Sequence, residues 1–241
     1  FGSVESRTEA FSRPPEIVRT GSHLFEFVDI VNGLRGWGRG LRKAVAKWYT
    51  GKDADKLAYQ MVKYRQRKGW THRDLLRKSH PSAEGPLASL FSWAVGGDDG
   101  FEALPTLVTN FIKLQNAEEV SEVLSILKED KNISWEMIPD KFIKDKDVWA
   151  TLIENGIPLT ALIRNLPRMT NIGMFDNFSR YTAKVVGKLT DPEYIRKSRV
   201  HPVTALEAYK TYCSGESFRG SNKWTPNRKI ENALNKTFLL R

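Results

Sequence analysis

Apolar side chains recur at helical spacing along this 241-residue chain, and strand-like alternation is nearly absent. In the segment 39–49, Leu41, Val45 and Trp48 lie at positions i, i+4 and i+7 and form one apolar stripe along a helix. The cations of the same segment fall on the complementary face. This spacing predicts an all-α fold in which amphipathic helices bury their apolar stripes against one another.

Capping residues indicate where several of these helices begin and end. Asp53 is the expected N-cap of a helix over 53–68, and Gly69 is its expected stop. Thr71 is expected to cap a short helix that runs to His80. Further helices are predicted over 16–32, 39–49, 121–129 and 147–154, after Thr190 or Asp191 before Pro192, and after Thr225 before Pro226.

A helix followed by an Ile-Pro turn occurs twice in the middle of the chain. Ile138-Pro139 follows the helix over 121–129, and Ile157-Pro158 follows the helix over 147–154. This recurring unit predicts a stacked α-solenoid of HEAT-like repeats with an irregular period. No Pro- or Ser-rich linker divides the chain, so we expect one continuous domain over residues 1–241.

The composition is that of a globular protein without a membrane span. No window approaches about 18 uninterrupted apolar residues, the length that a membrane-spanning helix needs. The first residues have neither an initiator Met nor the apolar core of a signal peptide, which indicates a processed or excised piece. The single cysteine, Cys213, cannot form an internal disulfide and fits a reducing compartment. We therefore expect cytoplasmic residence, or nuclear residence if the source is eukaryotic.

Positive charge is concentrated in one window of the sequence. Between Arg35 and His80 there are 14 Lys and Arg residues against three acidic ones, a local net charge of +11, whereas the whole chain carries +10. Aromatic side chains are interleaved with these cations, and three of them, Trp37, Trp48 and Trp70, fall on apolar stripes and are expected in the core. A charge excess concentrated in this way predicts a surface for a polyanion.

The cations and histidines of this window are the candidate phosphate-binding residues. On the predicted helix over 53–68, Lys63 and Arg67 lie four residues apart, so their side chains can reach adjacent phosphates together. A histidine can donate to a phosphate or a 2′-hydroxyl, although His80 equally suits a helix-capping role. The further candidates are Arg39, Arg42, Lys43, Lys56, His72, Arg73 and Arg77, and, in a second basic block, Arg164 and Arg168.

Five blocks of sequence resemble, in order, the core motifs of the Ro autoantigen (TROVE) family of ring-shaped RNA-binding proteins. The blocks read WGRGLRKAVAKWY, VKYRQRKGWTHRDLLRKSH, DKFIKDKDVWATLIENGIPLTALIRNLPRMT, IRKSRVHPVTALEAYKTY and KWTPNRKIENALNKTF, and the resemblance as a whole spans roughly residues 24–238. The resemblance implies HEAT-like repeats curved into a ring with a basic inner channel. Members of the family also have earlier helices and a C-terminal von Willebrand factor A-like domain with a DxSxS metal motif, which we do not expect within these 241 residues. We therefore expect a TROVE fragment, and an open arc unless another chain completes the ring.

The resemblance also implies a function. Positions that match Lys63, Arg67 and His80 bind RNA in the family, where single-stranded 3′ ends of misfolded RNAs thread the central hole. Small noncoding Y RNAs occupy an overlapping outer surface, and bacterial relatives tether an exoribonuclease through a Y RNA. For this chain the resemblance implies an RNA-binding module in noncoding RNA quality control. Its expected partners are Y RNA-like or misfolded RNAs and, for a bacterial source, such a nuclease.

Motifs of the common enzyme classes are absent from the sequence. Its four histidines form no HExxH motif and have no companion cysteines, and the glycine-rich stretch 36–40 lacks the Gly-Lys-Ser/Thr ending of a P-loop. We therefore expect no catalysis, no metal and no cofactor. Two alternatives stay open: a scaffold that docks an acidic partner through its basic surface, and a nuclease that uses His72, His80 and Asp74.

Overall fold

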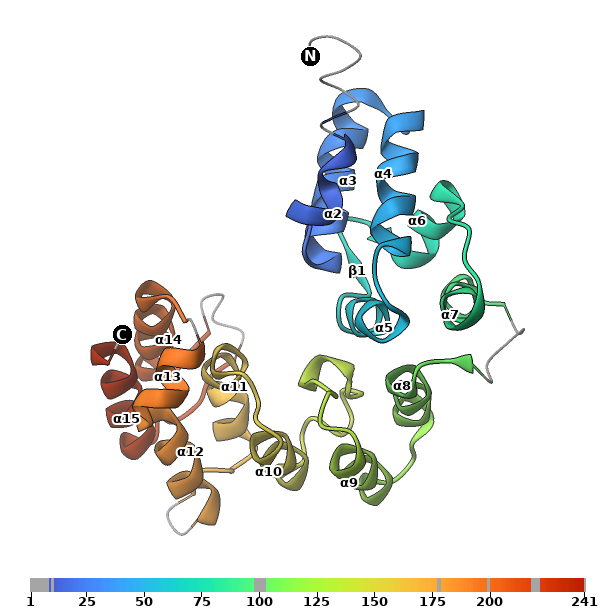
Figure 1. Ribbon diagram of the computed structural model, residues 1–241. Coiled ribbons are helices and arrows are strands. Elements are labelled where there is room, and N and C mark those ends of the chain that lie inside the picture. Colours follow the sequence, from blue (N-terminus) through green and yellow to red (C-terminus); the bar gives the residue numbers. More distant parts are fainter. Residues whose placement is uncertain are drawn as a thin grey trace. The chain divides into compact units, whose positions relative to one another are not determined.

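The computed structural model describes residues 9, 11–97, 103–176, 179–198, 200–217 and 222–240. Helices dominate this part of the chain, as the spacing predicts (Figure 1). The chain divides into two compact units, Phe1–Lys113 and Leu114–Arg241. Their boundary falls inside a helix, α8, and not in a linker. The single continuous domain and the HEAT-like ring or arc stay predictions.

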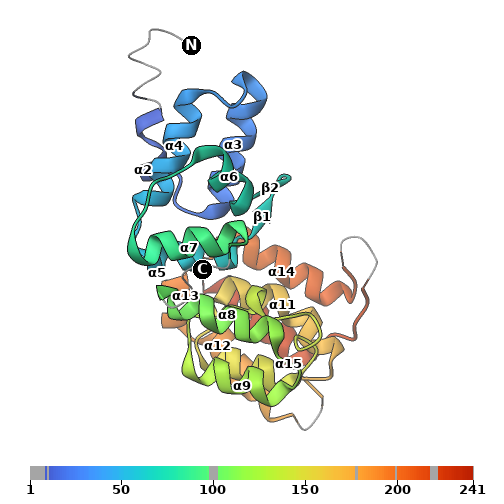
Figure 2. The ribbon, with the colours of Figure 1, turned by 90° about the vertical axis from the view of Figure 1, so that its right-hand side faces the viewer.

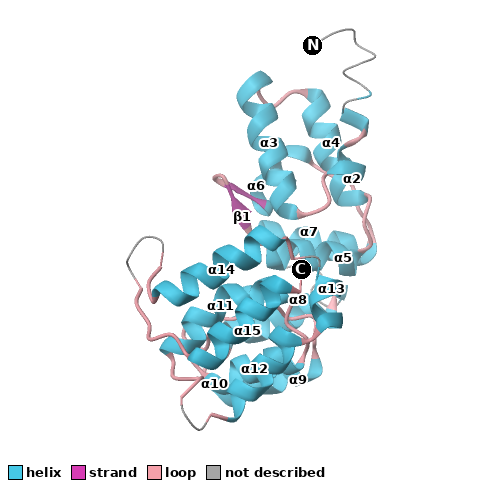
Figure 3. Cartoon of the chain, turned by 90° about the vertical axis from the view of Figure 1, so that its left-hand side faces the viewer, coloured by secondary structure: helices cyan, strands magenta, loops and turns pink. Residues whose placement is uncertain are grey.

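The first unit consists of short helices and one β-hairpin. The hairpin is antiparallel and leads directly into α6; Figures 2 and 3 show it from two sides. The elements of this unit are α2 (Pro14–Ile17), α3 (Gly21–Arg35), α4 (Arg39–Thr50), α5 (Ala54–Lys63), β1 (Gln66–Arg67), β2 (Trp70–Thr71), α6 (His72–Ser79), α7 (Gly85–Val95) and most of α8 (Thr106–Asn116).

The core of the first unit is built around α4. Its predicted stripe is buried, and Trp48 is fully enclosed, with its indole Nε1 donating to the carbonyl oxygen of Val18 at 2.6 Å. Tyr49 is also fully buried and lies edge-on to Phe91 of α7, with ring centroids 5.9 Å apart. Burial of large apolar side chains such as these stabilises the fold by about 1.5–3 kcal/mol each.

The prediction of one helix over 16–32 is wrong, because the helix is interrupted. Helix α2 ends at Ile17, and α3 begins at Gly21 with Thr20 as its N-cap. The Thr20 hydroxyl accepts a hydrogen bond from the backbone N–H of His23. A Thr at this position offers the backbone a local alternative to continuing the helix, which explains the break.

The predicted helix over 53–68 is also too long, because α5 ends at Lys63. The chain then forms the hairpin, in which Arg67 pairs with Trp70 across a two-residue turn. The turn residues Lys68 and Gly69 both have positive φ, 54° and 76°, as a type I′ hairpin turn requires. A glycine with positive φ serves a helix stop and a hairpin turn equally well, so the sequence pattern did not separate the two.

The described residues of the second unit form helices, an isolated bridge and connecting loops. The second Ile-Pro turn leads straight into α11, whereas the first is followed by turns until α10 begins at Lys146. The elements are α9 (Val120–Glu129), a 3₁₀ turn η2 (Trp135–Met137), α10 (Lys146–Glu154), α11 (Leu159–Asn171), α12 (Arg180–Thr190), α13 (Pro192–Ser198), α14 (Pro202–Ser214) and α15 (Arg228–Leu239).

Caps fix the helix starts of the second unit. Asp191 caps α13 as predicted, because its Oδ1 accepts from the backbone N–H of Glu193 at 2.9 Å. The predicted start after Thr225 is wrong, since α15 begins at Arg228 with Asn227 as its N-cap. In either unit, no described helix is long and apolar enough to cross a membrane.

Candidate nucleic-acid interface

Arg67 lies on the hairpin and is held by helix α3. Its Nη1 donates to Ser22 Oγ and its Nη2 pairs with Glu26 Oε1, both at 2.8 Å. The prediction that Arg67 and Lys63 share one helix is therefore wrong, because α5 ends before Arg67. The Arg67 side chain is still 52% exposed, and a guanidinium has five N–H donors. Arg67 is thus oriented by α3 and remains accessible to a phosphate.

Lys63 is the last residue of α5 and lies among aromatic rings. Its Nζ donates to Tyr59 Oη at 2.9 Å and lies 5.2 Å from the Tyr59 ring centroid and 5.7 Å from that of Tyr64. A cation at these distances is attracted to the faces of the rings. The half-buried ammonium is therefore positioned, whereas a lysine on an open helix face is mobile.

His80 both ends α6 and stays exposed. Its backbone N–H donates to the carbonyl oxygen of Leu76 at 2.9 Å, and its φ of 48° and ψ of 56° lie in the left-handed region. A non-glycine residue in this region costs about 1–3 kcal/mol. The side chain is exposed to solvent, so the capping role of the backbone and a binding role of the imidazole are compatible.

The prediction that His72 contacts RNA is wrong, because His72 is a core residue. Its side chain is enclosed by Phe25, Trp48 and Tyr49, and the residue is only 5% exposed. Its Nδ1 lies 2.6 Å from Tyr49 Oη. Burial lowers the pKa of His72 to about 4, so the ring is neutral near pH 7. The nuclease alternative loses its first histidine, which no RNA can reach in this conformation.

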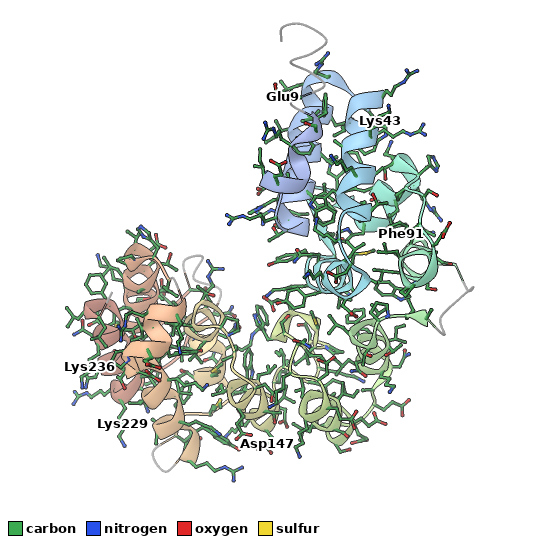
Figure 4. All side chains as sticks on the ribbon, viewed as in Figure 1. Glu9, Lys43, Phe91, Asp147, Lys229 and Lys236 are labelled. Atoms are coloured by element: carbon green, nitrogen blue, oxygen red, sulfur yellow. The ribbon has the colours of Figure 1, made fainter. Side chains whose placement is uncertain are left out.

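Helix α4 presents a row of exposed cations opposite its buried stripe. Arg39, Arg42, Lys43 and Lys47 are all exposed, and Figure 4 marks Lys43 on this helix. Arg39, Lys43 and Lys47 repeat every four residues and so lie along one side of the helix. The expected separation of a basic face and an apolar face on this helix is therefore confirmed.

The remaining candidates of the first unit differ in how they are engaged. Arg73 is exposed, and Arg77 is exposed with its Nη2 donating to the carbonyl oxygen of Val95 at 3.2 Å. Lys56 is 81% exposed but pairs with Asp53 Oδ2 at 2.8 Å. Solvent screens such an exposed pair, so a phosphate can compete with Asp53 for Lys56.

Two tryptophans of the first unit are less buried than predicted. Trp37 and Trp70 are half-buried and stack on each other, with ring centroids 5.9 Å apart and an interplanar angle of 27°. The Trp37 indole donates to the carbonyl oxygen of Lys78, whose Nζ lies 5.6 Å from the Trp37 ring centroid. Their apolar spacing predicted the core. It did not reveal that the pair lies beside an exposed lysine, and Lys78 was not among the predicted site residues.

Arg164 and Arg168 lie in the second unit, on α11. Both are exposed, and the helix runs through Pro167, so their four-residue spacing does place them one turn apart as predicted. The Arg168 guanidinium lies 5.5 Å from the ring centroid of Trp135. Ten of the twelve predicted residues are thus in the first unit, and these two are in the second. No cluster of three or more metal-ligating side chains occurs in the described part of the chain.

Comparison with known proteins identifies the family. A family model described as the TROVE domain matches residues 13–97 and 124–233, most of the chain. The chain belongs to the TROVE domain family. A TROVE relative from Caenorhabditis elegans, named RNA-binding protein RO60, is 34% identical over 93% of this chain and 44% of its own length. The protein of the same name from Deinococcus radiodurans is 33% identical over 99% of this chain and 45% of its own length.

A solved TROVE structure has the same fold. The crystal structure of the Deinococcus radiodurans Ro (Rsr) protein matches 99% of this chain and 48% of that chain, with a TM-score of 0.79 and 30% sequence identity. The chain spans slightly less than half the length of these relatives. The helical arrangement of both units is therefore that of a TROVE protein.

Proposed function

We propose that this chain binds structured noncoding RNA and that the first unit supplies the main phosphate contacts. The observation that carries the proposal is the exposed cation set of α4, the hairpin and α6, in a window with few acids. Two of the three acids of this window are occupied locally, because Asp53 caps α5 and Asp74 forms a capping box with Thr71. Relatives that are named RNA-binding proteins support the same interpretation.

Within this proposal, Lys63, Arg67 and His80 form the primary site. Arg67 is oriented by α3, Lys63 by its aromatic neighbours, and His80 is exposed at the end of α6. A site of positioned cations binds phosphates with a smaller loss of side-chain entropy than mobile lysines do. The RNAs that we propose are Y RNA-like small RNAs and misfolded RNAs with a single-stranded 3′ tail, in RNA quality control.

The proposal also covers the protein partner and the cellular compartment. An exoribonuclease tethered through the bound RNA is the proposed protein partner, and the cytoplasm is the proposed compartment. No catalytic step is assigned to this chain, which acts by capturing RNA. The HEAT-like ring or arc is the proposed setting in which a single-stranded tail is separated from a duplex.

The test compares a hairpin RNA that carries a 3′ single-stranded tail with the same hairpin lacking it. We expect the tailed RNA to bind more tightly, and Lys63→Ala/Arg67→Ala to weaken binding by at least about tenfold, because two phosphates then have no positioned cation. Lys128→Ala/Lys131→Ala is the matched control, since it removes two exposed lysines of the second unit. An equal weakening in both double variants would show that only net charge matters. An acidic polypeptide that binds as tightly as RNA would favour the scaffold alternative.

A further inference from the structure

A groove with an apolar floor opens on the first unit beside the start of α4. It has a volume of about 500 Å³, which is within the range of small-ligand sites. Phe11, the end of α3, the Gly36–Gly38 turn and the first turns of α4 line it. It includes none of Lys63, Arg67 or His80, so it is distinct from the proposed primary site.

The floor of the groove is apolar and contains one aromatic ring. Val31 contributes aliphatic surface, Leu41 lines the groove although only 2% of it is exposed, and Phe11 lies directly on Gly40. A Cβ atom at Gly40 would lie only 2.8 Å from Phe11 Cδ2, so the missing side chain is what lets the ring approach α4. The groove therefore offers an aromatic ring and aliphatic surface against which a planar group can pack.

The rim of the groove is cationic. Arg39, Lys43 and Lys47 stand along one side of α4, and Arg35 stands at the end of α3. Four residues of helix rise about 6 Å, so the three α4 cations form a row that can follow a strand of phosphates. None of these three forms an ion pair with a described residue, and no acidic residue of the described chain lines the groove. Their charge is therefore available to an anionic ligand.

We propose that this groove binds one unstacked nucleotide of a single-stranded RNA, as an addition to the proposed RNA-binding function on which this inference rests. The base stacks on Phe11 over the aliphatic floor, and the flanking phosphates contact Arg39, Lys43 and Lys47. Stacking on an aromatic ring tolerates any base, and clustered cations bind any phosphate backbone. The groove would therefore select single-stranded over double-stranded RNA without selecting a base sequence. A fatty acid would use the floor but only one of several cations, which favours a nucleotide.

Leucine substitutions at two glycines provide a matched pair of variants, one inside the groove and one outside it. A Cβ at Gly38 meets nothing within 4 Å, and its φ of −87° suits any residue, so Gly38→Leu places a side chain in the groove without backbone strain. A Cβ at Gly33 also meets nothing within 4 Å, but Gly33 does not line the groove. We expect Gly38→Leu to weaken binding of a ten-nucleotide oligouridylate about tenfold, and Gly33→Leu to leave it unchanged.

Two neighbouring cations of α4 provide a second pair. Lys43 lines the groove and Arg42 does not, yet both are exposed on the same helix. Lys43→Glu and Arg42→Glu change the net charge equally, so a loss of affinity several times larger for Lys43→Glu isolates the groove. This comparison decides the matter even if Gly38→Leu lowers the thermal stability.

Photocrosslinking locates the bound base. An oligouridylate with one 5-iodouridine is irradiated on the full chain, and the crosslinked peptide is identified by mass spectrometry. The inference requires a crosslink to Phe11 that is absent in Gly38→Leu. If the chain binds the tailed hairpin but both pairs behave alike and Phe11 is not crosslinked, the groove inference fails and the proposed function stands. If neither RNA binds, both fail together.

Discussion

Tyr49 Oη and His72 Nδ1 share a buried hydrogen bond of 2.6 Å that joins α4 to α6. Burial raises the pKa of Tyr49 well above its usual value, and the charge of Asp74 adds to this effect. The tyrosine is therefore neutral, as is the histidine, and the pair is a polar link inside an aromatic core. This link holds the start of α6 against α4. Arg73 and Arg77 are exposed on α6, and His80 is exposed at its end.

Removal of the Tyr49 hydroxyl should destabilise the fold without changing the affinity for RNA. In Tyr49→Phe, His72 Nδ1 loses its partner in a site that water does not reach, which costs about 1–3 kcal/mol. Urea denaturation measures this loss, and RNA affinity measured below the unfolding transition should be that of the parent chain. An unchanged free energy of unfolding would show that the hydrogen bond contributes nothing.

The stability should depend on pH through His72. The pKa of His72 is lowered by burial to about 4, against an ordinary value of 6.5, so the unfolded chain binds more protons between these values. The free energy of unfolding therefore rises with pH across this window and reaches its full value above about pH 6.5. The expected loss between pH 6.5 and 4 is about 3 kcal/mol from this group alone.

The control for this pH dependence is a comparison of two histidines. His72→Phe removes the titrating group from the core and should flatten the rise between pH 4 and 6.5. His80→Phe alters an exposed histidine and should leave the rise in place. An identical pH profile for the parent chain and His72→Phe would contradict a neutral, buried His72.

Release of Arg67 from Glu26 should strengthen RNA binding. Glu26→Gln removes a carboxylate that competes with phosphate for the guanidinium, while the hydrogen bond to Ser22 Oγ still orients Arg67, so we expect a gain of about threefold in affinity. The half-exposed ion pair contributes little to folding, so the free energy of unfolding should change by less than about 1 kcal/mol. Asp29→Asn makes the same charge change at an exposed position of α3 and is the matched control. Equal gains in both variants would mean that Arg67 has no special role.

His80 should lower the stability of the fold while contributing to RNA affinity. Its left-handed backbone suits glycine, so His80→Gly should raise the free energy of unfolding by about 1 kcal/mol while RNA affinity falls. His80→Ala keeps the strained backbone and removes the imidazole, so it should lose affinity without the gain in stability. Thermal unfolding and filter binding on the same samples separate the two effects. Undiminished affinity in both variants would remove His80 from the site.

The parts of the fold that depend on local signals were predictable from the sequence. Helix α4 follows its apolar stripe, and α6 follows the Thr71 capping box, because both signals act within a few residues. The hairpin was missed because Gly69 satisfies two local interpretations, and only packing of β1 against α3 selects the turn.

The candidate site was predictable in its charge but not in its geometry. The cation-rich window identified Arg67, yet its orientation depends on Ser22 and Glu26, 45 and 41 residues earlier in the chain. In the sequence, His72 lies in the same cation-rich window as Arg73 and His80 and was predicted to bind phosphate for the same reason. Its burial is set by Phe25 and Trp48, which come from two other helices, so periodicity within α6 could not show it.

The salt dependence of RNA binding tests the central claim most directly. For the tailed hairpin, the logarithm of the association constant should fall linearly with the logarithm of salt concentration. In Lys63→Ala/Arg67→Ala the slope should be shallower by about 1.4, or about 0.7 for each single-strand phosphate that the variant no longer neutralises. A slope that the double variant leaves unchanged, or no binding of the parent chain at physiological salt, would contradict the account.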